Sequence, residues 1–311
     1  MPQKRLTRHA ISGVLILNKP LGLSSNGALQ RVKYLLRAKK AGHTGALDPL
    51  ATGVLPLCFG EATKFSNYLL DADKTYQSEF TFGVATDSGD SDGEILREAD
   101  ASEVRHADLL KAIEQFSGDI EQVPPMYSAL KHQGQPLYKL ARQGVEITRR
   151  PRPVTIKRFE LLDFQAGKVA KARVEVECSK GTYIRSLAMD IGELLGVGGH
   201  VSALHRIQAG PFRAEDMLNI DDIALKLPEN ESYSVDNAQK ILKPVDAGIE
   251  YIPALEISAE QAADLRLGRK ITVAGNVSNG LVRVMLRAAF IGLADANGQT
   301  LQPKRLVVEN T

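Results

Sequence analysis

The sequence predicts an α+β protein in which a large domain, residues 1–250, is followed by a small β-rich module, residues 251–311. Segments that alternate like β-strands, such as 74–82, lie among segments with helical spacing of apolar residues, such as 184–195. In 169–178 apolar and charged residues alternate, which is typical of an antiparallel strand with one face in solvent. After residue 250 the pattern changes to one short helix and several short strands, which indicates a second unit of about sixty residues.

The composition is that of a globular protein. The 311 residues are 43% hydrophobic and 24% charged, and no apolar run approaches the roughly 20 residues that span a bilayer. The apolar run 14–17 is too short for the core of a signal peptide, so we expect a cytoplasmic protein with no membrane contact. The first ten residues include Lys4, Arg5 and Arg8 and are expected to form a flexible basic tail.

Neither the cysteines nor the histidines are spaced like metal ligands. The two cysteines, Cys58 and Cys178, lie far apart in apolar or strand-like segments, which excludes a disulfide framework. The acidic stretch 86–93 fails as a calcium loop because Ser88 would stand at the first ligand and Ala99 at the bidentate glutamate. We expect no metal, and we interpret 86–93 as a structural turn without a chemical role.

Two clusters of basic residues raise the question of a nucleic-acid partner. The net charge is only +2, but five cations lie within ten residues that contain no acid, and four more lie between residues 142 and 152. The first cluster is Arg31, Lys33, Arg37, Lys39 and Lys40, and the second is Arg142, Arg149, Arg150 and Arg152. Such clusters form a solvated face more often than a ligand site, yet phosphate contacts require them, so charge alone leaves RNA binding open.

The N-terminal region is expected to begin with a buried strand at 14–17 and a turn at 18–22. A helix then begins at Ser24, Ser25 or Asn26, with apolar residues at helical spacing toward the core. Most of the first basic cluster lies on the other face of this helix and ends just before the most distinctive stretch of the chain.

That stretch is GHTGALDPLATGVL, residues 42–55, which we expect to form an ordered loop. Pro49 disfavours a helical conformation at Asp48, and glycines such as Gly45 permit backbone angles that other residues avoid. The pattern also fits a simpler structure, a helix with Asp48 as N-cap and Pro49 in its first turn.

The spacing of apolar residues places the remaining elements in order along the chain. We expect helices at 65–70, 109–116 and 138–142, and strands at 74–82, 154–161 and 169–178. Residues 221–250 have weak helical patterns and are expected to join the two units. In the C-terminal module a capping box of Ser258 and Gln261 begins a helix, and short strands are expected at 271–274, 281–286, 290–294 and 301–308.

A further helix is expected after the turn at 179–183, and it carries Arg185 in its first turn. The helix dipole disfavours a cation there, so a carboxylate partner would be stabilising. An exposed arginine is the simpler alternative.

The string GHTGALDPLATGVL closely resembles the signature of the TruB family of bacterial tRNA pseudouridine synthases. Lys74-x-Tyr76 and GTYIRSLAMDIG resemble two further motifs of that family, in the same order, and residues 251–311 resemble its C-terminal PUA-like RNA-binding domain. The resemblance covers roughly residues 11–311. It implies a pseudouridine synthase catalytic domain with a mixed, mainly antiparallel sheet.

The resemblance also implies roles for individual residues. Asp48 would be catalytic and Arg185 would pair with it, while Tyr76 would stack on the target base and is a candidate to move the base proton. His43 would fill the space left by a base flipped out of the RNA. Tyr183 and Leu204 correspond to positions that bind the uracil.

The expected reaction converts the T-loop uridine, position 55 of tRNA, to pseudouridine by glycosidic bond cleavage, base rotation and rejoining through carbon 5. Asp48 could add to carbon 6, attack carbon 1′ or act as a base in a glycal route. The reaction needs no cofactor, and Leu195-Gly196-Val197-Gly198-Gly199 lacks a nucleotide-binding pattern.

The expected partner is the T-arm stem-loop of tRNA, with no obligate protein partner and a monomeric state, and a role in tRNA folding is also implied. Two other classes stay open: a non-catalytic RNA-binding protein, and a hydrolase with an aspartate nucleophile.

Overall fold

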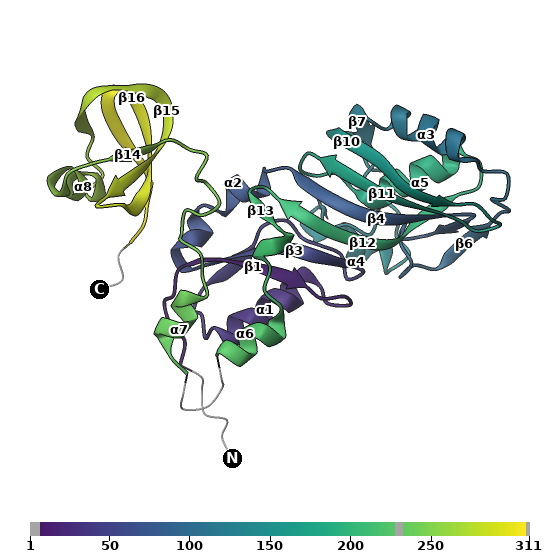
Figure 1. The fold of residues 1–311 in the computed structure, drawn as a ribbon, viewed down its shortest axis with the longest axis horizontal. Helices are drawn as coiled ribbons and strands as arrows, with labels where there is room; N and C mark the ends of the chain where they lie inside the picture. Colours follow the sequence, from purple (N-terminus) through teal and green to yellow (C-terminus); the bar gives the residue numbers. More distant parts are fainter. Residues whose placement is uncertain (1–6, 228–232, 309–311) are drawn as a thin grey trace, which may run out of the picture.

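The computed structural model describes residues 7–227 and 233–308. A nine-stranded sheet forms the centre of the larger part of the molecule (Figure 1). Its strands follow the order β1 (Gly13–Lys19), β3 (Ala51–Phe59), β12 (Gly199–Ala209), β4 (Lys74–Phe82), β11 (Ala170–Cys178), β10 (Arg152–Gln165) and β7 (Gly118–Gln122), with β2 (Ala41–His43) on β3 and β13 (Phe212–Arg213) on β12. All pairs are antiparallel except β12 with β3, so the predicted mixed, mainly antiparallel sheet is confirmed.

Helices surround this sheet. Near β1 lie α1 (Ser25–Leu35), α6 (Ile220–Lys226) and α7 (Val235–Lys240), and at the other end α3 (His106–Gln115) and α5 (Ile184–Leu194) pack on the sheet (Figure 1). The short helices η1 (Gly60–Lys64) and α2 (Ser66–Leu70) follow β3, and η2 (Ala214–Asp216) follows β13. The side chain of Ser24 accepts a hydrogen bond from the Gly27 amide at 3.0 Å, so Ser24 is the N-cap of α1.

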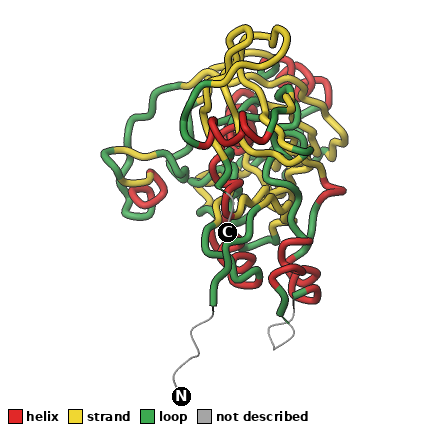
Figure 2. The backbone as a smooth tube through the Cα atoms, turned by 90° about the vertical axis from the view of Figure 1, so that its left-hand side faces the viewer, coloured by secondary structure: helices red, strands yellow, loops and turns green. Residues whose placement is uncertain are grey.

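Two hairpins extend from the sheet. One is formed by β5 (Val84–Thr86) and β6 (Ile95–Glu98). The other, β8 (Lys131–His132) with β9 (Gln135–Pro136), is followed by α4 (Leu137–Ala141). Together β8, β9 and α4 belong to a segment, residues 123–151, that extends from the main body as an arm (Figure 2).

The sequence correctly predicts β1, β4, β10, β11 and the helices α1, α2, α3, α4 and α5, to within a few residues at their ends, but it does not predict β7 or β12, and its loop at 42–55 is too long. Residues 51–59 form the buried strand β3, and 41–43 form β2, which leaves only residues 44–50 as a loop. β3 is paired on both edges, and eight of its nine residues are buried, so its apolar run reflects burial of both faces rather than the alternation expected of a half-exposed strand.

The C-terminal part has its own apolar core, which includes Leu265, Val284 and Leu301. It consists of β14 (Ala254–Glu256), α8 (Ala259–Arg266), β15 (Ile271–Leu286) and β16 (Ala289–Leu306). The four short strands expected here are instead two long antiparallel strands, because register shifts interrupt the ladder without ending it. The predicted capping box of Ser258 and Gln261 is present.

A second apolar cluster joins this part to the sheet. Phe65 packs edge-on against Phe290, with ring centroids 5.2 Å apart, beside Ile249 and Leu293. Arg283 also forms a 2.8 Å ion pair with Asp246. The boundary between residues 250 and 251 stays a prediction.

The predicted basic tail lies partly outside the described residues, which begin at residue 7. His9 is hydrogen-bonded through its main chain to Arg37 and Lys39, so the end of the predicted tail is anchored rather than free. No helix among residues 7–227 and 233–308 is both long and apolar enough to cross a membrane.

Candidate active site

A cavity of about 280 Å³ opens where the loop after β2 meets the start of β4, the C-terminal half of β12 and the start of α5. The arm also contributes to its wall through residues 128 and 129. Five of the six residues that the sequence singled out line this cavity: Asp48, Tyr76, Tyr183, Arg185 and Leu204. The fold therefore brings together residues that lie up to 156 positions apart in the chain.

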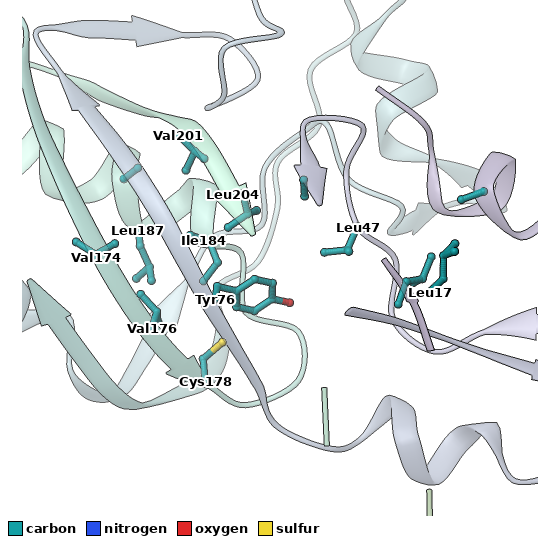
Figure 3. Close-up of a cluster of buried hydrophobic side chains, with 14 of the residues drawn as sticks. Leu17, Leu47, Tyr76, Val174, Val176, Cys178, Ile184, Leu187, Val201 and Leu204 are labelled. Carbon is teal, nitrogen blue, oxygen red and sulfur yellow. The ribbon is translucent and has the colours of Figure 1, made fainter. Parts of the chain in front are cut away.

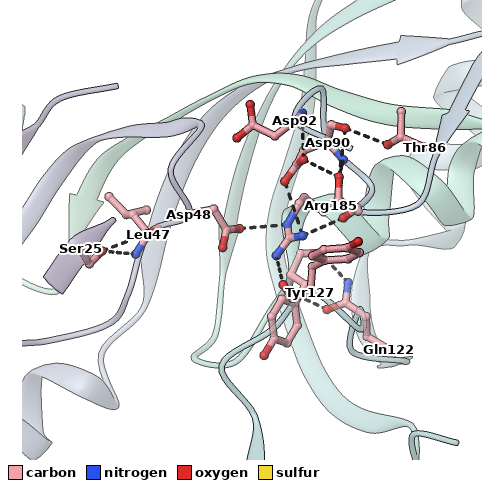
Figure 4. A network of polar contacts seen from close by, with 11 residues as sticks. Ser25, Leu47, Asp48, Thr86, Asp90, Asp92, Gln122, Tyr127 and Arg185 are labelled. Carbon is pink, nitrogen blue, oxygen red and sulfur yellow. Dashed lines mark hydrogen bonds and ion pairs between the residues drawn. The ribbon is translucent and has the colours of Figure 1, made fainter. Parts of the chain in front are cut away.

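Asp48 lies in a short loop that is fixed at both ends. The Leu47 amide donates to Ser25 Oγ at 2.7 Å, and Ser25 Oγ donates back to the Leu47 carbonyl at 3.0 Å (Figure 4). The Ala51 amide donates to the Asp48 carbonyl at 3.0 Å, and β3 follows immediately. No helix begins at Pro49, so the helix-cap interpretation of Asp48 is wrong.

Arg185 reaches Asp48 from the first turn of α5. Its Nε lies 2.9 Å from Asp48 Oδ2, and Nη1 and Nη2 donate to the carbonyl oxygens of Ser88 and Tyr127, each at 2.7 Å (Figure 4). The arginine side chain is only 4% exposed, so the exposed-arginine alternative is wrong. The guanidinium is held rigidly, and its Nε is directed at the carboxylate.

Asp90 is a second carboxylate beside this guanidinium, and the sequence analysis missed it. Its Oδ2 lies 3.5 Å from Arg185 Nη1, and its side chain is 6% exposed. Asp90 lies in the turn 86–93, for which we expected no chemical role, and Ser88 in the same turn contacts Arg185. Nothing local in the sequence separates this carboxylate from the neighbouring Asp87 and Asp92, because its partner is 95 positions away.

Burial and charge act in opposite directions on Asp48. Solvent reaches the side chain through the mouth of the cavity, and 41% of it is exposed, but the surrounding walls raise the pKa of the carboxyl above its ordinary value. Arg185 lowers this pKa, Asp90 raises it, and the burial effect is the largest of these. The site thus holds a carboxylate whose proton affinity is increased but which keeps a cationic partner.

Tyr76 forms the apolar side of the cavity. Figure 3 shows its ring among Ile184, Leu204 and Cys178, with the hydroxyl directed toward the loop that carries Leu47. Burial raises the pKa of the Tyr76 hydroxyl, and the nearby Arg206 opposes this rise. A flat aromatic surface beside an ion pair suits a planar heterocycle.

Tyr183 directly precedes α5 and is fixed by a side chain of β7. Its amide donates to Gln122 Oε1 at 2.7 Å, and Gln122 Nε2 donates to its carbonyl at 2.9 Å. This two-way contact sets the start of the helix that presents Arg185.

His43 is not among the residues that line the cavity. It lies on β2, opposite Leu57 on β3, and is partly buried. Burial and the charge of Arg206 lower the pKa of its imidazole, so the neutral form is favoured. Its Nδ1 is buried without a hydrogen-bond partner among the described residues.

Two buried lysines support the loops around the cavity. Lys19 donates to the carbonyls of Pro20, Leu23 and Pro49, and Lys74 donates to those of Leu70 and Ala72. Burial is the main cause that lowers the pKa of each to about 8. Within the part of the chain that the structure describes, no group of three histidine, cysteine, aspartate or glutamate residues is placed to hold a metal ion.

Comparison with known proteins identifies the family. Residues 33–184 match the model of the "TruB family pseudouridylate synthase (N terminal domain)", and residues 185–250 and 253–307 match two models of C-terminal domains of the same family. Among curated proteins, the chain is 51% identical to tRNA pseudouridine synthase B of Saccharophagus degradans, with 100% of both chains covered. It is 48% identical to tRNA pseudouridine synthase B of Pseudomonas aeruginosa, with 99% of both covered.

Solved structures share the fold. An H/ACA RNP bound to a substrate RNA containing 2′-deoxyuridine contains a chain that matches with a TM-score of 0.70 and 24% identity, over 96% of this chain and 85% of that one. A chain of an archaeal box H/ACA sRNP complex matches with a TM-score of 0.69 and 24% identity, over 96% and 86%. With three family models in order along the sequence and full-length relatives near 50% identity, the chain belongs to the TruB family of pseudouridylate synthases.

Proposed function

We propose that this chain isomerises the uridine at position 55, in the T loop of tRNA, to pseudouridine. The relatives of about half-identical sequence are named tRNA pseudouridine synthase B, which supports tRNA as the substrate. The observation that carries the proposal is the ion pair of Asp48 and Arg185, 2.9 Å long, on the wall of a cavity that also holds Tyr76. The cavity of about 280 Å³ lies near the lower end of the size range of ligand pockets, which suits one base.

The base has to leave the RNA before it can enter this cavity. Flipping a nucleotide out of a folded loop costs a few kcal/mol, and contacts in the pocket and at the vacated position offset this cost. Tyr76 would stack on the flipped base between Leu204 and Tyr183. His43 lies outside the cavity, on the strand that leads to it, which suits a side chain that fills the gap left in the RNA.

Asp48 would carry out the chemistry in its ionised form. Addition to carbon 6 of the base, attack on carbon 1′ of the ribose and proton abstraction in a glycal route all require a charged carboxylate at this place. Arg185 favours that form against the effect of burial, and its three other contacts fix where the carboxylate points. Tyr76 is the candidate to move the proton that leaves carbon 5 after the new bond has formed.

The position of the modified uridine tests the substrate assignment. Unmodified tRNA is incubated with the enzyme, and pseudouridines are mapped by chemical adduct formation and primer extension. We expect a single new pseudouridine at position 55, and none when that uridine is replaced by cytidine. Modification elsewhere in the tRNA, with position 55 unchanged, would contradict the proposed substrate.

We also propose that the enzyme acts as a monomer, with the T-arm stem-loop as a sufficient substrate. An isolated T-arm stem-loop should then be modified by purified protein alone. A requirement for a second protein would show that the site is incomplete in this chain.

A further inference from the structure

Arg206 is a buried cation beside the active site that neither the sequence analysis nor the proposed chemistry uses. Arg206 is only 1% exposed and lies on β12. In the sheet, Arg206 is paired with Tyr76 on β4 on one side and with Gly53 on β3 on the other. It therefore lies between the strand that carries Tyr76 and the strand that follows the Asp48 loop.

The guanidinium contacts the main chain on both sides of that loop. Nε donates to the carbonyl of Val54 at 2.6 Å, and Nη2 donates to the carbonyl of Gly45 at 3.1 Å. Gly45 precedes Asp48 by three residues, and Val54 follows it by six. Because one rigid planar group binds both carbonyls, it fixes the width and direction of the loop between them.

The same guanidinium lies over the ring of Tyr76. Its Cζ is 6.0 Å from the ring centroid, and its charge opposes the larger effect of burial, which raises the pKa of the Tyr76 hydroxyl. A guanidinium is planar and always charged, so it is attracted to the face of an aromatic ring. The position of the Tyr76 ring thus depends on this arginine.

No described carboxylate forms an ion pair with Arg206, although ion pairs are common elsewhere among the described residues. A buried cation without a carboxylate partner is costly unless its donors are satisfied. Here Nε and Nη2 donate to the two carbonyls and the guanidinium lies over the Tyr76 ring, and all three partners belong to the segments that form the cavity. The contacts of Arg206 therefore link it to the walls of the cavity.

We propose that Arg206 is a positioning residue that fixes the Asp48 loop and the Tyr76 ring relative to each other. This inference rests on the proposed function, since it concerns the geometry of the same reaction. It assigns no chemical step to Arg206, which acts through Asp48 and Tyr76.

Arg206→Lys tests this inference, because lysine keeps the positive charge but has one terminal ammonium in place of a planar fork. A displacement of reacting groups by about 1 Å can lower a rate by roughly 100-fold, and we expect a loss of that order in the single-turnover rate. The Kd for a T-arm stem-loop should stay within about threefold of wild type, since the phosphate contacts are unchanged. Arg173→Lys is the matched control, because Arg173 is an exposed arginine on β11, also paired with β4.

Hydrogen exchange supplies a readout that does not depend on turnover. In Arg206→Lys the amides of residues 44–50 should exchange faster by about tenfold, while those of β10 and β11 keep their wild-type rates. If Arg206→Lys cannot be purified as folded protein, Arg206→Gln is used for both measurements, since its amide can still donate to one carbonyl. For either variant the rate is divided by the concentration of folded protein, which a thermal unfolding curve determines.

The outcomes separate the two proposals. A slow single-turnover rate, an unchanged Kd and faster exchange confined to residues 44–50 together support the positioning role. A wild-type single-turnover rate in Arg206→Lys overturns it. A lower Tm with full activity per folded molecule also overturns it, because Arg206 would then have a purely structural role. If wild-type protein makes no pseudouridine in the T arm, the proposed function itself has failed.

Discussion

At the residue scale, the geometry of the candidate active site depends on how the guanidinium of Arg185 is held. Arg185 contacts Asp48, Asp90 and two carbonyls, so it cannot rotate away from the carboxylate without breaking several bonds at once. This is the reason that the Asp48 carboxylate keeps a defined direction in a cavity open to solvent. The residue-scale predictions therefore concern this network.

Arg185→Ala should lower both stability and activity. It leaves the 6%-exposed carboxylate of Asp90 without its cation, and breaking a buried pair costs about 3–5 kcal/mol of the free energy of unfolding. Denaturant unfolding measures this loss. Arg97→Ala is the control, because its ion pair with Glu193 is exposed and should contribute about 0–1 kcal/mol. Near-normal turnover in Arg185→Ala would show that the Asp48 pairing is dispensable.

The pH dependence should report Asp48. Its pKa is raised, so ionised enzyme and hence activity are lost as the pH falls through a value above the ordinary aspartate pKa. Asp90 contributes to that rise, so Asp90→Asn should move the acid limb of kcat/KM to lower pH. Asp92→Asn, an exposed neighbour in the same turn, should leave the limb where it is. A shift to higher pH in Asp90→Asn would contradict this electrostatic account.

His43→Ala should reduce turnover or RNA engagement less than Asp48→Asn does. His43 lies outside the cavity, so we expect it to affect the flipped state rather than the bond changes. Single-turnover rates and Kd values of both variants, measured side by side, check the order. A larger rate loss for His43→Ala would overturn it.

The residues also show what a single sequence can and cannot predict. Asp48, Tyr76 and Arg185 lie in distinctive motifs, and their convergence on one cavity was expected. The sequence assigns no role to Asp90, which lies in a polar turn, or to Arg206, because the role of each depends on a partner 95 to 161 positions away. Local pattern carries no information about such distant contacts.

At the element scale, strand pairing was harder to predict than strand position. The positions of β4 and β11 can be predicted from their alternation of apolar and polar residues. β3 has no such alternation, because it is paired at both edges and buried on both faces. In the C-terminal part, β15 and β16 were divided into four strands because bulges interrupt their patterns. Burial on both faces and register shifts depend on tertiary structure, so the periodicity of apolar residues does not predict them.

Gly53 shows how tightly β3 and β12 approach each other. Its φ is +98°, and a Cβ there would lie 2.3 Å from the carbonyl oxygen of Arg206. Gly53→Ala should therefore lower Tm and activity together, with a loss of stability on the order of 1–3 kcal/mol or more from the strained backbone and the clash. Differential scanning calorimetry measures the effect.

Gly42→Ala is the matched control for this substitution. Gly42 lies on the neighbouring strand β2, and a Cβ there would meet nothing within 4 Å. The Tm of Gly42→Ala should stay close to that of the wild-type protein. Equal effects of the two substitutions would argue against the close approach of β12 as the cause.

At the scale of the whole molecule, recognition of RNA should be electrostatic and distributed. The first basic cluster lies on α1 and the segment after it, and the second lies on the arm and the start of β10, with most of these side chains exposed or partly exposed. The two clusters belong to different parts of the fold, so we expect each to contribute phosphate contacts of its own. The net charge of +2 conceals this local asymmetry.

Binding of tRNA should accordingly weaken as salt increases. Each phosphate contact contributes about 0.9 to the slope of log K against log salt concentration, so Lys39→Gln with Lys40→Gln should lower the slope by roughly one to two. Lys111→Gln on α3 is the control, because it lies outside both clusters. Affinity that is the same at low and high salt would exclude the proposed phosphate contacts.

The central claim is that the carboxylate of Asp48 isomerises a uridine that has been flipped into the cavity. The most direct test uses tRNA labelled with tritium at carbon 5 of uridine, because that hydrogen is lost only when carbon 5 becomes bonded to the ribose. Wild-type protein should release tritium in proportion to the pseudouridine formed, and Asp48→Asn, which keeps the shape of the side chain but not its charge, should release none above background. Release by Asp48→Asn at the wild-type rate, or no release by the wild type, would contradict the account.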